Sequence, residues 1–392
     1  MDIKKEIESL KEELIDLRRD FHKYPELGFE EYRTSEKIAE YLKSLGIEVH
    51  TNVAKTGVVG LLRGDTDGKT LLMRADMDAL SVTEENDVTY KSLNEGKMHA
   101  CGHDGHMAML LVAAKILSRN KDRICGNIKF VFQPNEEDAG AKYMVEEGVL
   151  ENPHVDAAMA IHLWSPIETG KMSICEGPVM GAMDIFKIII KGKGGHTAMP
   201  QYAIDPVIVA AQIITGSQVI ATKQINPLTP TIVSFAKVDA GTSSNIIPEF
   251  VEMQGTLRYL YKGGSDSIEK PRERLEKIVK GICETFDTTY EIEFQSSNFT
   301  VENDKELTAL VRKNGVRLVG EENLVPYQTM AGEDFSEFTT NIPSTFYFVG
   351  MGNKEKGTDY PHHHPKFDID EDALEIGVEM HIRSALDYLS RN

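Results

Sequence analysis

The chain has 392 residues, of which 41% are hydrophobic and 27% charged, a composition typical of a globular protein long enough for two compact units. The formal net charge of −19 argues against nucleic acid or an anionic membrane surface as a partner, because both require clustered Lys and Arg. No apolar run approaches the length of a membrane span.

Residues 1–24 predict a charged amphipathic helix that lacks the apolar core of a secretory signal peptide. Its apolar stripe consists of Ile3, Ile7, Leu10, Leu14 and Leu17. The four cysteines of the chain are scattered and form no C-x-x-C pair, so a disulfide framework is not expected. We therefore expect a cytoplasmic protein.

Short apolar runs alternate with helical stretches such as 107–117 over much of the chain. These runs cover residues 58–62, 70–75, 127–132, 157–161 and 344–349. This rhythm predicts an α/β fold with a mostly parallel central sheet.

The pattern changes between residues 183 and 296. The expected order there is strand 185–191, helix 206–223, strands 231–238 and 250–257, helix 267–286 and strand 290–294. This β-α-β-β-α-β order is that of a small, ferredoxin-like α+β domain. We predict one domain formed by residues 1–182 and 297–392, interrupted by an inserted domain over residues 183–296.

One thiol and three imidazoles fall within residues 99–106, just before a predicted helix: His99, Cys101, His103 and His106. Thiolate and neutral imidazole are the preferred ligands of zinc and similar ions. A single histidine is more often a core or surface side chain. Four such groups together, separated by small Gly and Ala residues, favour a metal site.

Further ligand types follow other predicted strands. Glu136 and Glu137 follow strand 127–132, Asp76 and Asp78 follow residues 71–73, His162 follows strand 157–161, and three histidines at 362–364 follow strand 344–349. Because the functional crevice of an open α/β sheet lies at the carboxyl ends of its strands, we expect these groups to converge.

The adjacent glutamates suit two different roles, since successive residues leaving a strand point in different directions. One would bind the metal, and the other would accept a proton from water that the metal has acidified.

The ordered motifs of the chain resemble those of the M20 family of metallopeptidases over nearly the whole sequence. They are Asp16-Leu-Arg-Arg-Asp-Phe-His22, Arg74-Ala-Asp76-Met-Asp78, residues 99–106, Gln133-Pro-Asn-Glu136-Glu137, Gly194-Gly-His196-Thr-Ala-Met-Pro200, Ser244-Asn245-Ile-Ile-Pro248, Gly255-Thr-Leu-Arg258 and Ala331-Gly-Glu-Asp-Phe335. The similarity is to the amidohydrolase branch, which includes aminoacylases, hippurate hydrolases, auxin-conjugate hydrolases and N-acetyldiaminopimelate deacetylases.

This resemblance implies the metal ligands Cys101, His103, Glu137, His162 and His363, with Glu136 as general base. His363 is flanked by His362 and His364, and the ligand histidine of relatives stands two places before a proline. Asp76 is implied as an active-site residue that orients a ligand histidine. Cys101 with His103 replaces the His-x-Asp pair of the wider family. One or two divalent transition ions per subunit are therefore expected, zinc first, with manganese, cobalt and nickel as alternatives.

The inserted domain resembles the lid of that family, which also forms a homodimer interface. By the same resemblance, His196 reaches the active site of the partner subunit and polarises the scissile carbonyl. Asn245 and Arg258 are implied to hold the free carboxylate of the substrate, for which the planar guanidinium is suited.

These observations predict a metal-dependent amidohydrolase of the aminoacylase type, which cleaves N-acyl-L-amino acids to a carboxylic acid and a free amino acid. One alternative is an M20-type carboxypeptidase or dipeptidase. A cysteine hydrolase that uses Cys101 with His103 or His106 is a second. A metal-dependent binding protein without catalytic activity is a third, against which the presence of Glu136 argues.

Overall fold

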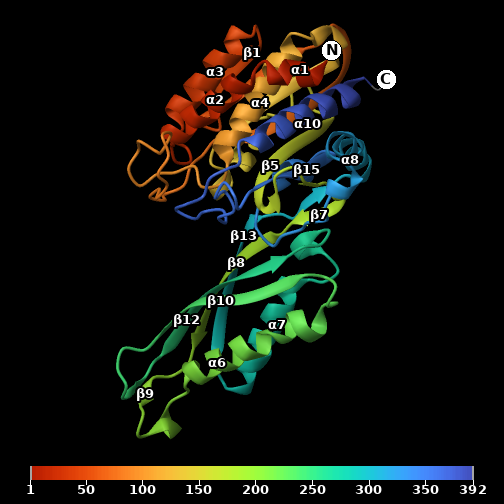
Figure 1. Cartoon of the computed structure of the whole chain (residues 1–392). Coiled ribbons are helices and arrows are strands. Elements are labelled where there is room, and N and C mark those ends of the chain that lie inside the picture. Colours follow the sequence, from red (N-terminus) through yellow and green to blue (C-terminus); the bar gives the residue numbers. More distant parts are fainter. Residues whose placement is uncertain (1, 391–392) are drawn as a thin grey trace. The chain divides into compact units, whose positions relative to one another are not determined.

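The computed structural model describes residues 2–390, which fold as two compact units (Figure 1). Residues 1, 391 and 392, which our domain boundaries include, lie outside the described residues. The first unit contains the chain up to residue 179, residues 301–327 and the chain from residue 334 onward. The second unit contains residues 180–300 and 328–333.

The predicted boundaries place segment 328–333 in the larger domain. In the structure, this segment packs with the second unit. Thr329 forms a parallel bridge with Met180, and the Gly181 amide donates to the Ala331 carbonyl at 2.9 Å. Arg258 donates to the Met330 carbonyl at 3.1 Å. These bonds to residues distant in sequence hold the segment, and no local pattern reveals them.

The first unit is built on a seven-stranded sheet with the order β1-β2-β4-β3-β5-β15-β6. The strands are β1 (Glu48–Val53), β2 (Gly57–Arg63), β3 (Thr66–Asp76), β4 (Cys125–Gln133), β5 (Ala157–Glu168), β6 (Met172–Ser173) and β15 (Ser344–Gly352). The central four, β4-β3-β5-β15, are parallel, whereas β1, β2 and β6 pair antiparallel. The sheet is therefore mixed, and the predicted parallel arrangement applies to its centre. The short β1–β2 connection imposes antiparallel pairing, since a parallel pair needs a long crossover.

Helices of the first unit are α1 (Ile3–Glu8), α2 (Lys11–Lys23), α3 (Tyr32–Ser44), α4 (His103–Ser118), α5 (Ala141–Glu146), α8 (Lys305–Val319), α9 (Ser336–Thr339) and α10 (Asp372–Leu389). The predicted N-terminal helix is interrupted at Ser9 and Leu10, where the Ser9 hydroxyl donates to the Glu6 carbonyl. Residues 107–114 of α4 are all apolar and buried, and the helix packs against α2, α10 and β3. This burial fixes the helix that follows the cysteine–histidine motif.

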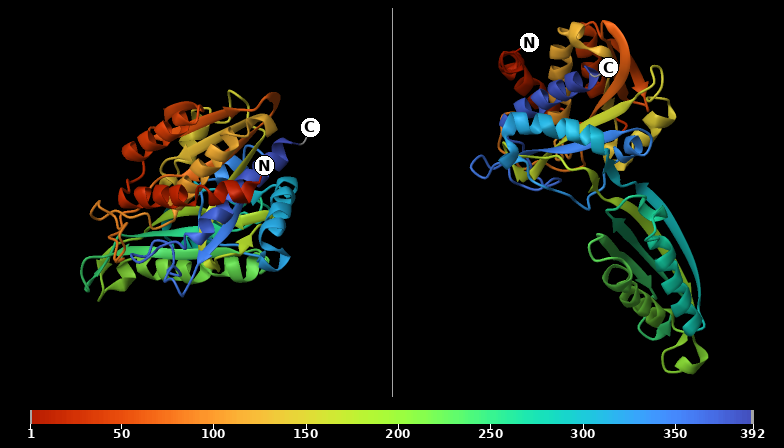
Figure 2. Two further views of the ribbon diagram at one scale, coloured as in Figure 1. Left: turned by 45° about the horizontal axis from the view of Figure 1, so that its top comes forward. Right: turned by 90° about the vertical axis from the view of Figure 1, so that its right-hand side faces the viewer.

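The second unit contains β8 (Ala182–Lys191), α6 (Pro206–Ser217), β10 (Thr231–Ala240), β12 (Phe250–Tyr259), α7 (Pro271–Thr285) and β13 (Thr289–Asn298). These strands form an antiparallel sheet with the order β10-β12-β8-β13. Alternate side chains of β8 are buried beneath α6 and α7, which pack on one face of this sheet (Figure 2). Residues 220–224 form a separate π-helical turn, so α6 is shorter than predicted.

Short strand pairs complete the structure. β9 (Gly195–His196) pairs with β11 (Ile246–Ile247), and β7 (Gly177–Met180) pairs with β14 (Val301–Asn303). Within residues 2–390, no helix has both the length and the apolar composition needed to cross a membrane.

The register of the central sheet sets Asp76 beside Gln133 and His162 beside Phe348, so the carboxyl ends of β3, β4, β5 and β15 share one edge.

Candidate metal centre

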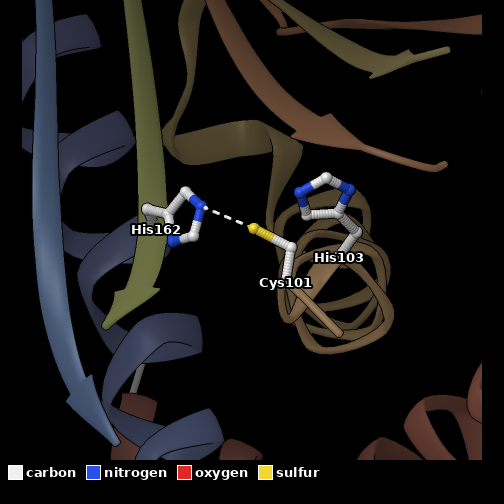
Figure 3. Close-up of side chains that lie close together, drawn as sticks. All are labelled: Cys101, His103 and His162. Carbon is white, nitrogen blue, oxygen red and sulfur yellow. Dashed lines mark hydrogen bonds between the residues drawn. The ribbon is translucent and has the colours of Figure 1, made fainter. Parts of the chain in front are cut away.

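Cys101, His103 and His162 meet at the carboxyl edge of the central sheet (Figure 3). All three are buried, and their ligand-type atoms lie within 4.8 Å of one another. Cys101 Sγ lies 3.7 Å from His162 Nε2. Gly102 separates Cys101 from His103 with a φ of 95°, a left-handed conformation that favours glycine. The bend allows Cys101, two residues before α4, and His103, the first residue of α4, to face the same point.

The two histidines of this cluster are held through their Nδ1 atoms. His103 Nδ1 donates to the Asp78 carbonyl at 2.8 Å, and His162 Nδ1 donates to the Leu163 carbonyl at 2.7 Å. His103 Nε2 is buried without a hydrogen-bond partner among the described residues. An imidazole fixed at one nitrogen, with the other free in a buried cluster, is suited to metal ligation.

The electrostatics of the cluster also favour a cation. Burial opposes a charge on His103, but Asp76 and Asp78 outweigh it and raise the pKa of His103 to about 10. Burial and the neighbouring His106 hold the pKa of His162 well below its usual value, so this ring is neutral. The site around His103 therefore favours a positive charge, next to the neutral imidazole of His162 and the thiol of Cys101. These three residues fit a transition-metal ion.

Three further groups share a residue with this cluster, each with ligand-type atoms within 4.8 Å of one another. They are Cys101, Glu137 and His363; His103, Glu136 and Glu137; and Asp76, His103 and His106. His363 Nε2 lies 3.2 Å from Glu137 Oε1. Because Cys101 and His103 each belong to more than one group, the donors extend over a region rather than a single point.

The three consecutive histidines have different surroundings. His362 Nε2 donates to the Leu163 carbonyl at 3.0 Å, and its ring stacks on Trp164 at 4.3 Å. His364 stacks on Tyr360, and its Nδ1 accepts from the Lys366 amide. Only His363 of the three joins a ligand-type group in the described chain. The geometry therefore favours His363 over its neighbours.

Asp76 is hydrogen-bonded to His106, which is not one of the predicted ligand histidines. Its Oδ1 accepts from His106 Nδ1 at 2.6 Å, while Leu163 N donates to His106 Nε2 at 2.8 Å. Both nitrogens of His106 are thus engaged. Arg74 donates to Asp76 Oδ2 at 2.6 Å. Burial opposes ionisation, but His103 and Arg74 outweigh it and keep the pKa of Asp76 well below its usual value. Asp76 orients His106 directly and faces the ligand-type His103 Nε2 at 3.7 Å.

The turn that carries Glu136 and Glu137 is anchored by two carboxylates. Glu31 accepts from the Asn135 amide at 2.9 Å, and Asp78 accepts from the Glu137 amide at 3.1 Å. Asn135 has a φ of 53°, and a Cβ added at Gly28 would lie 1.8 Å from its side-chain oxygen. Glu31 lies 104 residues from its partner, so no local sequence pattern reveals this contact.

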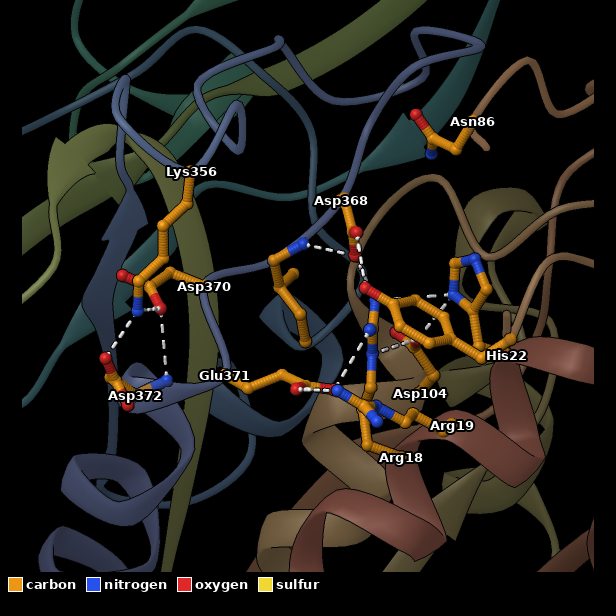
Figure 4. A network of polar contacts seen from close by, with 12 residues as sticks. Arg18, Arg19, His22, Asn86, Asp104, Lys356, Asp368, Asp370, Glu371 and Asp372 are labelled. Carbon is orange, nitrogen blue, oxygen red and sulfur yellow. Dashed lines mark hydrogen bonds and ion pairs between the residues drawn. The ribbon is translucent and has the colours of Figure 1, made fainter. Parts of the chain in front are cut away.

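The first turn of α4 is fixed by a buried ionic network (Figure 4). Asp104, the neighbour of His103, accepts from Arg18 Nε at 2.9 Å and from His22 Nδ1 at 2.7 Å. Arg18 also donates to Asp368 at 2.6 Å. The 16–22 motif therefore positions the helix end that bears the metal-type donors, a role that its sequence did not reveal.

The remaining predicted residues belong to the second unit. His196 is exposed on β9, and its Nδ1 accepts from the Ala198 amide at 3.0 Å. Asn245 lies beside it, since its carbonyl accepts from the Thr197 amide at 3.2 Å. β12 begins at Phe250, five residues after Asn245, and Phe250 pairs with Lys191 of β8. Arg258 lies near the last residue of β12, where it pairs with Met183 of β8. Eight extended residues span roughly 26 Å. Within one chain, Asn245 and Arg258 therefore do not grip the same carboxylate.

The environment of Cys101 argues against a cysteine hydrolase. A nucleophilic cysteine needs a lowered pKa and an electropositive setting. Burial, with Glu137 and Glu136 close by, instead raises the pKa of the Cys101 thiol well above its usual value. Among the described residues, His103 Nε2 has no hydrogen-bond partner and both nitrogens of His106 are occupied, so neither ring is hydrogen-bonded to the sulfur, which contacts His162 Nε2 instead. The thiol is better suited to a metal ion, which stabilises the thiolate directly.

Thiol, imidazole and carboxylate donors gathered at the strand ends of an α/β sheet are typical of metal-dependent hydrolases. Residues 72–387 match peptidase family M20/M25/M40, and the chain belongs to this family. It is therefore a hydrolase, as the sequence predicts.

Similar proteins cover almost the whole chain. It is 41% identical to thermostable carboxypeptidase 1 of Saccharolobus solfataricus, over 99% of this chain and 98% of that protein. It is also 41% identical to the N-acyl-L-amino acid amidohydrolase of Geobacillus stearothermophilus, over 84% and 89% of the two chains. The crystal structure of YXEP from Bacillus subtilis, described as a dinuclear metal-binding peptidase of the M20 family, matches with a TM-score of 0.86 and 33% identity over 98% and 100% of the two chains.

The ionic network predicts a pH-dependent contribution to stability. Burial and the Arg18 charge oppose protonation of His22, but its hydrogen bonds to Asp104 and Glu84 outweigh them and raise its pKa from 6.5 to about 9. Because the folded pKa is raised, this stabilisation is complete below about pH 6.5 and is lost as the pH rises to about 9. We expect His22→Gln to lower the free energy of unfolding by roughly 1–3 kcal/mol more at pH 6 than at pH 9.5.

Urea unfolding in the presence of a chelator measures this difference, and the single tryptophan of the chain, Trp164, reports on the first unit. His154→Gln, at an exposed histidine, is the control and should have little effect at either pH. An equal loss at both pH values in His22→Gln would contradict the assigned charge state.

Proposed function

We propose that the chain is a metal-dependent amidohydrolase that cleaves N-acyl-L-amino acids into a carboxylic acid and a free amino acid. The observation that carries this proposal is the buried Cys101–His103–His162 cluster, which overlaps the Glu136–Glu137 pair. The similarity to an N-acyl-L-amino acid amidohydrolase over 84% of the chain supports the choice of substrate.

The proposed metal ligands are Cys101, His103, Glu137, His162 and His363, with zinc as the first choice and manganese, cobalt or nickel as alternatives. One or two ions per subunit are compatible with the overlapping donor groups. A bound divalent ion acidifies water and polarises the amide carbonyl. Glu136, whose Oε2 lies 3.9 Å from His103 Nε2, would accept the proton of the attacking water and deliver it to the leaving nitrogen.

We also propose that residues 183–296 form a lid and dimerisation domain. β10 is an edge strand with the exposed apolar side chains Ile232 and Val238, and α6 exposes Val207 and Ile208. An unpaired strand edge and exposed apolar side chains favour association with a second copy. In a homodimer, His196 and Asn245 of one subunit would act with Arg258 of the other, which removes the conflict between their positions on one chain.

The second candidate is a carboxypeptidase, favoured by the 41% identity to thermostable carboxypeptidase 1. Its substrate would present the same amide and the same free carboxylate, and would differ only in the acyl portion. The proposed catalytic residues serve both reactions.

The two glutamates are distinguished by substitution. Glu136→Gln preserves size but removes the proton acceptor, so turnover should fall at least about a hundredfold while metal content remains nearly unchanged. Glu137→Gln should instead lower metal content, measured by elemental analysis after dialysis. The reverse pattern in the two variants would show that their roles have been exchanged.

Subunit mixing tests the action of His196 across a dimer. His196→Ala and Glu136→Gln enzymes should each be nearly inactive, and mixing them should restore part of the activity, because one site of a mixed dimer holds both intact groups. Exchange of subunits is checked by native mass spectrometry. If exchange occurs without recovered activity, His196 does not act in the partner subunit's site.

The substrate carboxylate tests the function itself. An N-acyl-L-amino acid should be cleaved far better than its carboxamide, because the carboxamide removes the charged partner of the part-buried Arg258, and loss of one partner of a hydrogen-bonded charge pair costs about 2–5 kcal/mol. Arg258→Lys should weaken this preference, since a point charge does not reproduce the bidentate fork. Initial rates on the acid, its carboxamide and a dipeptide with the same C-terminal residue are compared. Equal rates on the acid and carboxamide would refute the assignment, and a faster dipeptide would favour the carboxypeptidase.

A further inference from the structure

Lys129 is a buried lysine on β4 that the proposed reaction does not use. Its neighbours Ile128 and Phe130 belong to the core that contains α4, so Lys129 projects from the opposite face of the sheet. Only 3% of Lys129 is exposed. Its Nζ donates to the carbonyls of Val149 at 2.9 Å and Glu151 at 2.6 Å.

Among residues 2–390, this ammonium group has no carboxylate oxygen within 4.0 Å. Its two hydrogen bonds, to the main-chain carbonyls of Val149 and Glu151, use two of its three N–H donors. Burial lowers the pKa of Lys129 to about 8, opposed in part by Glu151. Buried charges in proteins are usually paired, so an anion at the third donor would stabilise this side chain.

A cavity lies beside this lysine. It has a volume of about 200 Å³, and Val53, Val59, Leu61 and Val149 provide its apolar walls. His50, Glu147 and Glu151 also line it. It is smaller than the pockets of drug-sized ligands, about 300–1,000 Å³, and therefore suits a molecule of about ten non-hydrogen atoms.

We propose that this cavity binds a small monocarboxylate with an apolar body. The carboxylate would accept the third N–H of Lys129, and the apolar body would lie against Val59, Leu61 and Val149. A single negative charge is favoured over phosphate, because the walls are apolar and Glu147 and Glu151 penalise a second charge. Glu147 is itself occupied, since it accepts from the Ala54 amide at 2.8 Å.

The cavity is separate from the candidate metal centre. Lys129 precedes Gln133 by four residues on β4, roughly 13 Å of strand. It also faces the side of the sheet away from α4, whose first residue is His103. The inference therefore does not depend on the catalytic assignment, and binding can be measured without turnover.

Benzoate and its uncharged counterpart benzamide provide a matched pair of probes for calorimetric titration of the full chain. Lys129→Met removes the charge while keeping a long side chain, and Val149→Phe fills the cavity while leaving the lysine. Lys142→Met, at an exposed lysine on α5, is the control for a general change in charge.

We expect Lys129→Met to weaken benzoate binding at least about tenfold, the scale of a hydrogen bond to a charged group. Val149→Phe should also weaken it at least about tenfold, because the larger side chain fills the cavity. Lys142→Met should bind as the wild type does, and benzamide should bind at least about tenfold more weakly than benzoate. If Lys129→Met disturbs folding, as judged by circular dichroism, Val149→Phe decides. Unchanged benzoate affinity in the folded variants overturns the proposal, as does equal affinity for benzamide. Benzoate binding that Glu137→Gln abolishes but Lys129→Met preserves would locate the acid at the metal centre and overturn it too.

Discussion

The ionic contact between Asp104 and Arg18 is the interaction on which the candidate metal centre depends. Asp104 lies in the first turn of α4, directly after His103 and three residues after Cys101. Arg18 and Asp104 are both fully buried, and His22 adds a second hydrogen bond to the same carboxylate oxygen. Because a buried carboxylate is costly without such partners, this contact fixes the helix end and the donors on either side of it.

The opposite side of the centre is held by hydrogen bonds of a different kind. Asp78 orients His103 through its carbonyl and holds the Glu137 amide through its carboxylate. Glu31 holds the amide of Asn135, two residues earlier in the same turn. One buried aspartate thus links the imidazole to the turn that carries the carboxylate donors, through its main-chain carbonyl on one side and its carboxylate on the other. Rigid placement of this kind is what a metal site requires.

The sequence predicts the convergence of donors because each follows an apolar strand, and parallel strands end at one edge of a sheet. It also predicts the family, which the match over residues 72–387 confirms. Contacts between residues far apart in the chain are not predicted by local patterns. His106 and His103 are the same residue type, yet Asp76 and Leu163 occupy both nitrogens of His106, whereas His103 Nε2 has no hydrogen-bond partner within residues 2–390. Glu31 and Lys129 resemble ordinary surface charges in the sequence, and only the fold reveals their burial.

The central claim is that Cys101 binds metal together with imidazole and carboxylate donors. X-ray absorption spectroscopy of the zinc-loaded enzyme measures this coordination directly. The account predicts a sulfur scatterer at about 2.3 Å together with nitrogen and oxygen at about 2.0–2.2 Å, and loss of the sulfur contribution in Cys101→Ser. A spectrum without sulfur in the wild-type enzyme, or one that Cys101→Ser leaves unchanged, would contradict it.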